Sequence, residues 1–205
     1  MIRETLVRPE RPLQAVMVPE SLRKLRLADF PVPAPSPEGW LENMQTLARF
    51  QELLSPGWHL EQPAQSVVLA APRRIWLEIL LVCLLRAIQA DLRRASQGLA
   101  PSLPAADAGE PRIALYLPAG AVALLLGEGH LYLQERRLQA KLTEAAALLI
   151  PDVHLLPPAV HSPLAKVLLQ RQAHRRPWFV TWEGPMEGPL FELLSHHATV
   201  LRFAA

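Results

Sequence analysis

The sequence predicts an α/β (or α+β) fold, with a layered mixed sheet covered by helices. Short apolar runs alternate with amphipathic stretches through the second half of the chain, a pattern typical of alternating strands and helices. Between Ile75 and Leu85 only Glu78 is polar, so this stretch forms a helix that other elements cover nearly all round. The chain also contains 21 prolines, and their three clusters mark the joints between its parts.

These joints divide the chain into four parts. Residues 1–37 are a proline-rich arm, which either packs over the main body or docks on a partner. Residues 38–97 are a mostly helical part that packs on the main body, and 98–111 are a linker or long loop. Residues 112–205 are the α/β part, and we expect it to form one domain with 38–97.

The first half of the sequence predicts two helices and one strand. Ser36 and Pro37 favour a helix start, and the helix spans 38–54. We expect its buried stripe at the following positions: Trp40, Met44, Leu47 and Leu54. An apolar strand covers 67–70. Pro72 then opens the apolar helix 73–94 and Gly98 closes it, with Cys83 and Leu84 buried within the chain.

The second half alternates, and its elements follow from apolar runs and helical spacing. The expected strands are 113–117, 130–133, 153–156, 179–182 and 199–203. The expected helices are 134–150, 163–174 and 189–195. Residues 118–126 are either a short helix or the first arm of a hairpin that turns at Gly127, Glu128 and Gly129.

The bulk composition excludes several classes of protein. The net charge is only +2, and neither half has the excess of cations typical of a dedicated nucleic-acid binder. The single cysteine, Cys83, lies among apolar neighbours and cannot form a disulfide within the chain. We find no secretory signal and no apolar run long enough to span a bilayer. We therefore expect a cytoplasmic protein without membrane insertion.

Strong catalytic motifs are absent from the sequence. It has no Gly-x-x-x-x-Gly-Lys-Ser/Thr, no Gly-x-Gly-x-x-Gly and no Gly-x-Ser-x-Gly. None of the seven histidines lies four residues from another, the spacing by which a helix presents two metal ligands. We therefore predict no cofactor, no metal and no catalytic residue, although whether the chain is an enzyme stays open.

Basic side chains concentrate on two expected helices, and they are the candidate nucleic-acid contacts. These residues are Arg136, Arg137, Lys141, Lys166, Arg171, Arg175 and Arg176. If both helices lie on one face of the sheet, the cations form a single patch. Trp178 and Trp182 follow closely and point to one side of a strand, which is either core or part of that surface.

Three functions are consistent with these observations. The first is a non-enzymatic adaptor or structural subunit of a larger cytoplasmic assembly, with other protein subunits as partners. The second is a nucleic-acid-associated accessory factor that uses the basic patch. The third is an enzyme whose site combines scattered groups such as Asp152, His154 and His161.

Overall fold

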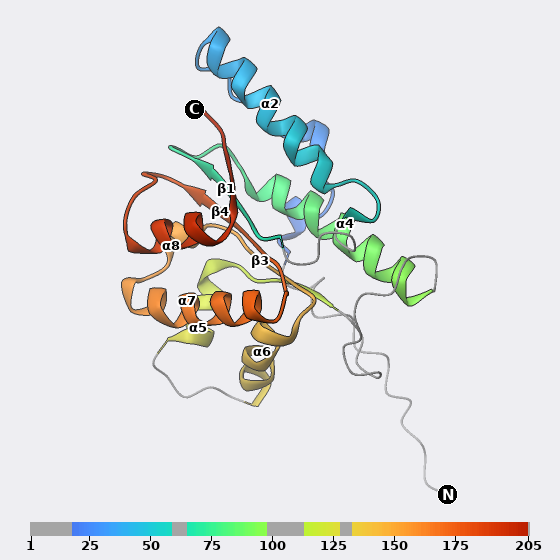
Figure 1. Ribbon diagram of the computed structural model, residues 1–205, viewed down its shortest axis with the longest axis vertical. Coiled ribbons are helices and arrows are strands. Elements are labelled where there is room, and N and C mark those ends of the chain that lie inside the picture. Colours follow the sequence, from blue (N-terminus) through green and yellow to red (C-terminus); the bar gives the residue numbers. More distant parts are fainter. Residues whose placement is uncertain (1–17, 59–64, 98–112, 128–132, 205) are drawn as a thin grey trace, which may run out of the picture.

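The computed structural model describes residues 18–58, 65–97, 113–127 and 133–204 (Figure 1). Within these ranges the chain forms a five-stranded sheet in the order β2-β3-β4-β1-β5, with every neighbouring pair parallel. The strands are β1 (Val67–Ala71), β2 (Ala114–Tyr116), β3 (Ala147–Ile150), β4 (Trp178–Glu183) and β5 (Thr199–Arg202). The predicted α/β class is confirmed, and the sheet is parallel rather than mixed.

Helices cover both faces of the sheet (Figure 1). The α-helices are α2 (Pro37–Leu53), α4 (Glu78–Ser96), α5 (Ala119–Leu126), α6 (Leu133–Glu144), α7 (Pro158–Ala173) and α8 (Pro189–His197). Single 3₁₀ turns are η1 (Glu20–Leu22), η2 (Leu27–Asp29) and η3 (Val153–Leu155). One apolar core lies between the sheet and α4, with α2 at its side, and a second lies between the sheet and α5–α8.

The first half of the chain supplies β1, which lies between β4 and β5. Val67 is paired with both Phe179 and Thr199, and all five residues of β1 are buried. Successive side chains point to opposite faces of a strand, so Val67 and Leu69 belong to the α4 core while Val68 belongs to the other. This burial on both faces explains why β1 is a continuous apolar run.

Helix α4 is the buried element that the sequence predicts. Cys83 and Leu84 are 8% and 0% exposed, so their predicted burial is confirmed. The helix begins at Glu78 and not at Pro72, because the intervening residues carry the chain from the sheet to the helix. In this turn Trp76 has a left-handed backbone (φ 65°) and its side chain is 49% exposed.

The predicted apolar stripe of α2 is confirmed at Leu47, but at its other three positions the buried residue lies one position earlier. Trp40 and Met44 are 47% and 37% exposed. The buried positions are Gly39, Asn43, Leu47, Phe50 and Leu53. Asn43 is fully buried because it joins three segments. Its Nδ2 donates to Pro33 O at 2.9 Å and Ala204 O at 2.6 Å, and its Oδ1 accepts the Ala204 N–H at 2.7 Å.

Two expected elements of the second half are also wrong. The helix predicted over 134–150 ends at Glu144, and the apolar residues after it form β3. An apolar run this short fits a helix or a strand equally well, and pairing with β2 and β4 decides for the strand. The strand predicted over 153–156 is η3, and α7 begins at Pro158, five residues before its expected start.

Other expectations fall partly outside the described residues. The linker 98–111, residues 1–17 of the arm and residues 130–132 of the strand expected over 130–133 lie outside them. Leu133, the last residue of that expected strand, begins helix α6 instead. Residues 119–126 are helix α5, so the hairpin alternative for this segment is wrong.

In the described part of the arm, Val18, Leu22 and Phe30 pack into the α4 core. None of the described helices combines the length and hydropathy that a membrane crossing requires.

We predict that Asn43→Ala lowers the free energy of unfolding by about 2 to 4 kcal/mol, because it leaves backbone groups of two distant segments without partners. Urea unfolding followed by circular dichroism measures the change. Gln45→Ala, at an exposed position of the same helix, is the control and changes the free energy by less than about 0.5 kcal/mol. Equal stability of the two variants would contradict the prediction.

Candidate functional site

The carboxyl ends of β1 and β4 form the first candidate site. Open parallel sheets bind ligands outside the carboxyl ends of their strands, where neighbouring connections leave to opposite faces. Here α4 follows β1 on one face, whereas α8 follows β4 on the other. The two strands are direct neighbours, so the topological switch point of this sheet lies between the turn 72–77 and the end of β4.

Glu183, the last residue of β4, lies at this switch point beside the turn 72–77. Its side chain is buried, and its Oε1 accepts the Leu77 N–H at 2.7 Å. Leu77 immediately precedes α4, so the carboxylate lies at the positive end of the helix dipole, where a negative charge is stabilised. The next residue, Gly184, donates its N–H to Ala71 O at 2.9 Å. These two hydrogen bonds join the end of β4 to both sides of the turn.

His154 supports Glu183 from the loop after β3. The Glu183 N–H donates to His154 Nδ1 at 3.1 Å, and the imidazole packs beside Trp182 with the ring centroids 6.1 Å apart. Burial lowers the pKa of His154 more than the carboxylates of Asp152 and Glu183 raise it. The imidazole is therefore neutral at pH 7, as an acceptor nitrogen requires.

The remaining polar groups make this edge acidic. Burial raises the pKa of the Glu78 carboxyl, and the negative charge of Asp152 adds to this effect, while Arg74 opposes it. Arg74 lies 3.8 Å from Glu78 Oε1 and also stacks over Trp76, 4.6 Å from the ring centroid. Asp152 has a left-handed backbone, and its N–H donates to Thr181 Oγ1 at 2.7 Å.

The scattered enzyme site of the third hypothesis does not form a metal centre. His154 binds the backbone of Glu183, whereas Nε2 of His161 lies 2.9 Å from Leu156 O within its own loop–helix junction. Among the described residues, no group of three or more histidine, cysteine, aspartate or glutamate side chains is placed to hold a metal ion.

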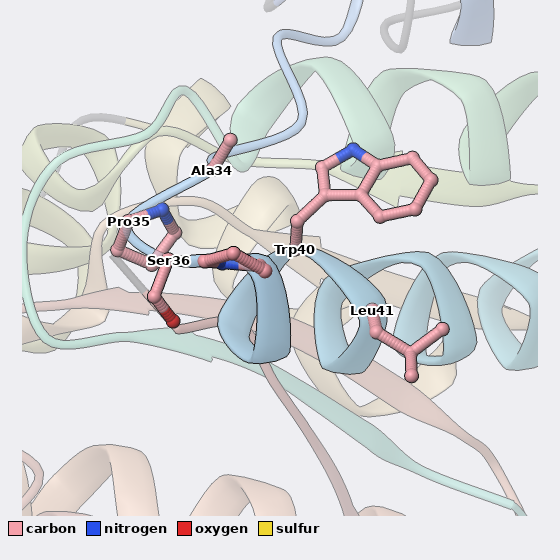
Figure 2. Close-up of a pocket in the computed structure, with 6 residues that line it drawn as sticks. Ala34, Pro35, Ser36, Trp40 and Leu41 are labelled. Atoms are coloured by element: carbon pink, nitrogen blue, oxygen red, sulfur yellow. The ribbon is translucent and has the colours of Figure 1, made fainter.

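A shallow hollow at the start of α2 is a separate feature (Figure 2). It is lined by Ala34, Pro35, Ser36, Pro37, Trp40 and Leu41. Its one hydroxyl, Ser36 Oγ, accepts the Gly39 N–H at 3.0 Å and caps the helix. The lining contains no acid, base or metal ligand, so we assign it no chemistry.

Arg171, one of the predicted nucleic-acid contacts, is buried, and its assignment to a surface patch is wrong. Its guanidinium donates to Leu142 O at 2.7 Å and to Ala145 O and Pro177 O, both at 2.9 Å. Burial, together with the nearby charge of Arg176, lowers its pKa to about 9, which leaves it charged at neutral pH. Through these hydrogen bonds the Arg171 side chain joins the end of α6 to the start of β4, and it does not face solvent.

The other predicted cations lie at or near the surface of α6 and α7, which pack against each other. Arg137, Lys166 and Arg175 are exposed. Lys141 and Arg176 are half-buried, and Arg176 Nη1 donates to Thr143 O at 2.8 Å. The side chain of Arg136 lies outside the described residues. We call Arg137, Lys141, Lys166, Arg175 and Arg176 the basic surface.

The tryptophans near this surface belong to the core. Trp178 and Trp182 are 0% and 7% exposed, and both lie in the core between the sheet and α5–α8. They do face one side of β4, as their spacing predicts. Because that side is covered by helices, neither indole is available to stack on a nucleic-acid base.

Comparison with known proteins identifies the fold but no family. No family model and no curated protein matches the sequence. Among solved structures, the chain is similar to the DnaC helicase loader (TM-score 0.59, 8% identity, 90% of this chain and 99% of that one). It is also similar to DnaI (0.55, 13%, 92% and 92%). A third similar structure is a DNA replication initiation factor (0.52, 13%, 88% and 49%).

This similarity corrects the first function hypothesis. We expected a non-enzymatic adaptor or structural subunit, but two of the solved structures that match about 90% of the chain are named as a helicase loader and a DNA replication initiation factor. The finding contradicts the adaptor hypothesis. The sequence alone did not indicate this similarity, because the chain is only 8% and 13% identical to these proteins.

We predict that Arg171→Ala destabilises the protein by about 3 kcal/mol, because three buried carbonyl oxygens lose their charged donor. Arg171→Lys is intermediate, since one ammonium cannot reproduce the fork of a guanidinium. Chemical unfolding measures both, with Gln170→Ala at an exposed position of α7 as the control. The structural role is excluded if Arg171→Ala is as stable as that control.

We also predict a pH effect from His154. Because its folded pKa lies below the ordinary 6.5, its contribution to stability is present above pH 6.5 and is lost as the pH falls toward the folded pKa. In His154→Asn, Oδ1 replaces the acceptor and does not titrate. Wild type should therefore lose more unfolding free energy than this variant between about pH 7.5 and about pH 5.5.

The matched control for this experiment is His174→Asn, at the exposed end of α7. Its pH dependence should follow that of wild type. Other titrating groups, including Glu78, are common to all three proteins and cancel in the comparison. Parallel pH profiles for wild type and His154→Asn would refute the assignment.

Proposed function

We propose that this chain is a nucleic-acid-associated accessory factor of DNA replication. The observation that carries the proposal is the fold shared over about 90% of the chain with two proteins whose names specify helicase loading and replication initiation. The distribution of charge on the described residues then suggests where DNA binds.

The basic surface is the part of the molecule suited to phosphate groups. Helix α7 contains no aspartate or glutamate, so nothing on it offsets Lys166 and the cations that follow. Lys141 is near the end of α6, and Arg175 and Arg176 directly precede β4. Lys141, Arg175 and Arg176 lie on the connections that enter β3 and β4, at the amino-terminal ends of these strands, whereas Lys166 lies in the middle of α7.

Three carboxylates lie at the opposite ends of the strands, where Arg73 and Arg74 partly offset them, and Glu144 lies at the same end as Lys141. Glu183 ends β4, Asp152 follows β3 and Glu78 begins the helix after β1. A polyanion is therefore attracted to one edge of the sheet and repelled from the other, which orients it on the protein.

The side chains of the basic surface favour backbone contacts over base recognition. Lysine and arginine bind phosphate oxygens irrespective of sequence, and the two nearby indoles are buried. We therefore propose binding to duplex DNA through its phosphates. By the same similarity we propose protein partners among replication proteins, and a cytoplasmic location stays a prediction from the sequence.

We predict that Lys166→Gln/Arg175→Gln weakens duplex binding and makes its salt dependence shallower. Each phosphate contact contributes about −0.9 to the slope of log Kobs against log salt concentration, so the double variant should lose about 2 units of slope. Fluorescence anisotropy with a labelled duplex, at several salt concentrations, measures both quantities.

The control is Lys24→Gln/Arg49→Gln, which also removes one exposed lysine and one exposed arginine but lies on the α4 side of the sheet. It should leave the slope unchanged. The proposed surface is rejected if both double variants change binding equally. Absence of salt-dependent binding by wild type rejects the proposed function.

A further inference from the structure

We infer that Glu183 occupies the position at which folds of this type commonly bind a nucleotide phosphate, and that the chain takes no nucleotide there. In open parallel sheets, phosphates bind the free N–H groups at the amino end of the helix that follows the first strand. A glycine-rich loop brings these groups to the ligand, and a lysine contributes its charge. The equivalent region in this chain is the turn between β1 and α4.

Apart from the Leu77 N–H, this turn lacks the features by which a glycine-rich loop holds a nucleotide phosphate. Residues 72–77 contain no glycine and no lysine, and Pro72 has no N–H to donate. The left-handed position belongs to Trp76 (φ 65°), where glycine is the usual residue. The Trp76 side chain is packed against the Arg74 guanidinium, so a bulky pair lies where a glycine-rich loop leaves room for a ligand.

The donor that could bind a phosphate already has an anionic partner. The Leu77 N–H lies 2.7 Å from Glu183 Oε1, and Glu183 is only 7% exposed. Glu183 is itself fixed by the hydrogen bond from its N–H to His154 Nδ1. A phosphate would have to displace this buried carboxylate.

The surrounding charges oppose the same ligand. Glu78 is the first residue of α4, and its carboxyl senses the charges of both Asp152 and Glu183. The nearest compensating cation, Arg74, already lies 3.8 Å from Glu78 Oε1. A nucleotide would therefore add negative charge where three carboxylates already interact, so nucleic-acid association by this chain would not depend on bound nucleotide.

The first experiment asks whether the intact chain binds nucleotide. Thermal unfolding is followed with ATP or ADP and Mg²⁺ at up to about 1 mM, together with titration calorimetry. A ligand present at about 100 times its Kd shifts Tm by several degrees. We expect no shift and no saturable heat. Saturable binding of either nucleotide overturns the inference, whether or not the chain binds DNA.

The second experiment tests Glu183 directly, with inorganic pyrophosphate as the probe. Glu183→Ala frees the Leu77 N–H and removes a charge, whereas Glu183→Gln removes the charge but keeps an acceptor. We expect pyrophosphate to raise Tm by several degrees more in Glu183→Ala than in wild type, with Glu183→Gln in between. Glu187→Ala, which removes an exposed carboxylate nearby in the sequence, should behave as wild type.

The comparison between variants separates this site from the basic surface. Pyrophosphate that binds Lys166 or Arg175 raises Tm equally in every variant, so only the difference counts. If Glu183→Ala is unfolded at the start of the melt, the pyrophosphate shifts of Glu183→Ser and Glu183→Gln are compared with that of wild type instead. Equal pyrophosphate shifts in wild type and all folded Glu183 variants overturn the assignment of Glu183 as the group that excludes phosphate.

Discussion

The parallel pairing of β1 with β4 and β5 is the constraint on which the rest of the structure depends. Without β1 the two later strands have no common neighbour, and the sheet is divided. Its side chains enter both apolar cores, so β1 also links the layer containing α4 to the layer containing α5–α8. Because β1 leads into α4 through a turn of only six residues, its position fixes the amino end of that helix beside Glu183.

Three buried polar side chains complete connections that the apolar cores cannot make. Asn43 joins the segment before α2 to the carboxyl end of the chain, Arg171 joins α6 to β4, and Glu183 joins β4 to α4. Each binds backbone groups where a regular element begins or ends, and such groups must be satisfied when they are buried. Because the strands are short, these hydrogen bonds hold the end of one helix or strand at a defined position beside the next.

Periodicity and composition were sufficient for the fold class, the burial of α4 and most strand positions, because each depends on local hydrophobicity. They failed where the burial of a residue depends on a partner that is distant in the sequence. Asn43 is buried because its partners are Pro33 and Ala204, and nothing in its own helix reveals them. The burial of Arg171 had a signal, since it follows Leu164 and Leu168 at helical spacing on the buried side of α7. The prediction that placed Arg171 on the surface considered its charge and not this spacing.

The small net charge of the chain conceals a separation of opposite charges between the two ends of the strands. A total of +2 suggests a weak field, yet the acids near Glu183 and three cations of the basic surface, Lys141, Arg175 and Arg176, lie at opposite ends of strands four to six residues long. At about 3.3 Å per residue, the two ends are about 13 to 20 Å apart. Coulomb interactions weaken with distance, so the acids near Glu183 reduce the attraction of these cations for a polyanion less than acids beside them would. A buried carboxylate that excludes phosphate from α4 is therefore compatible with a DNA-binding surface at the other end of the strands.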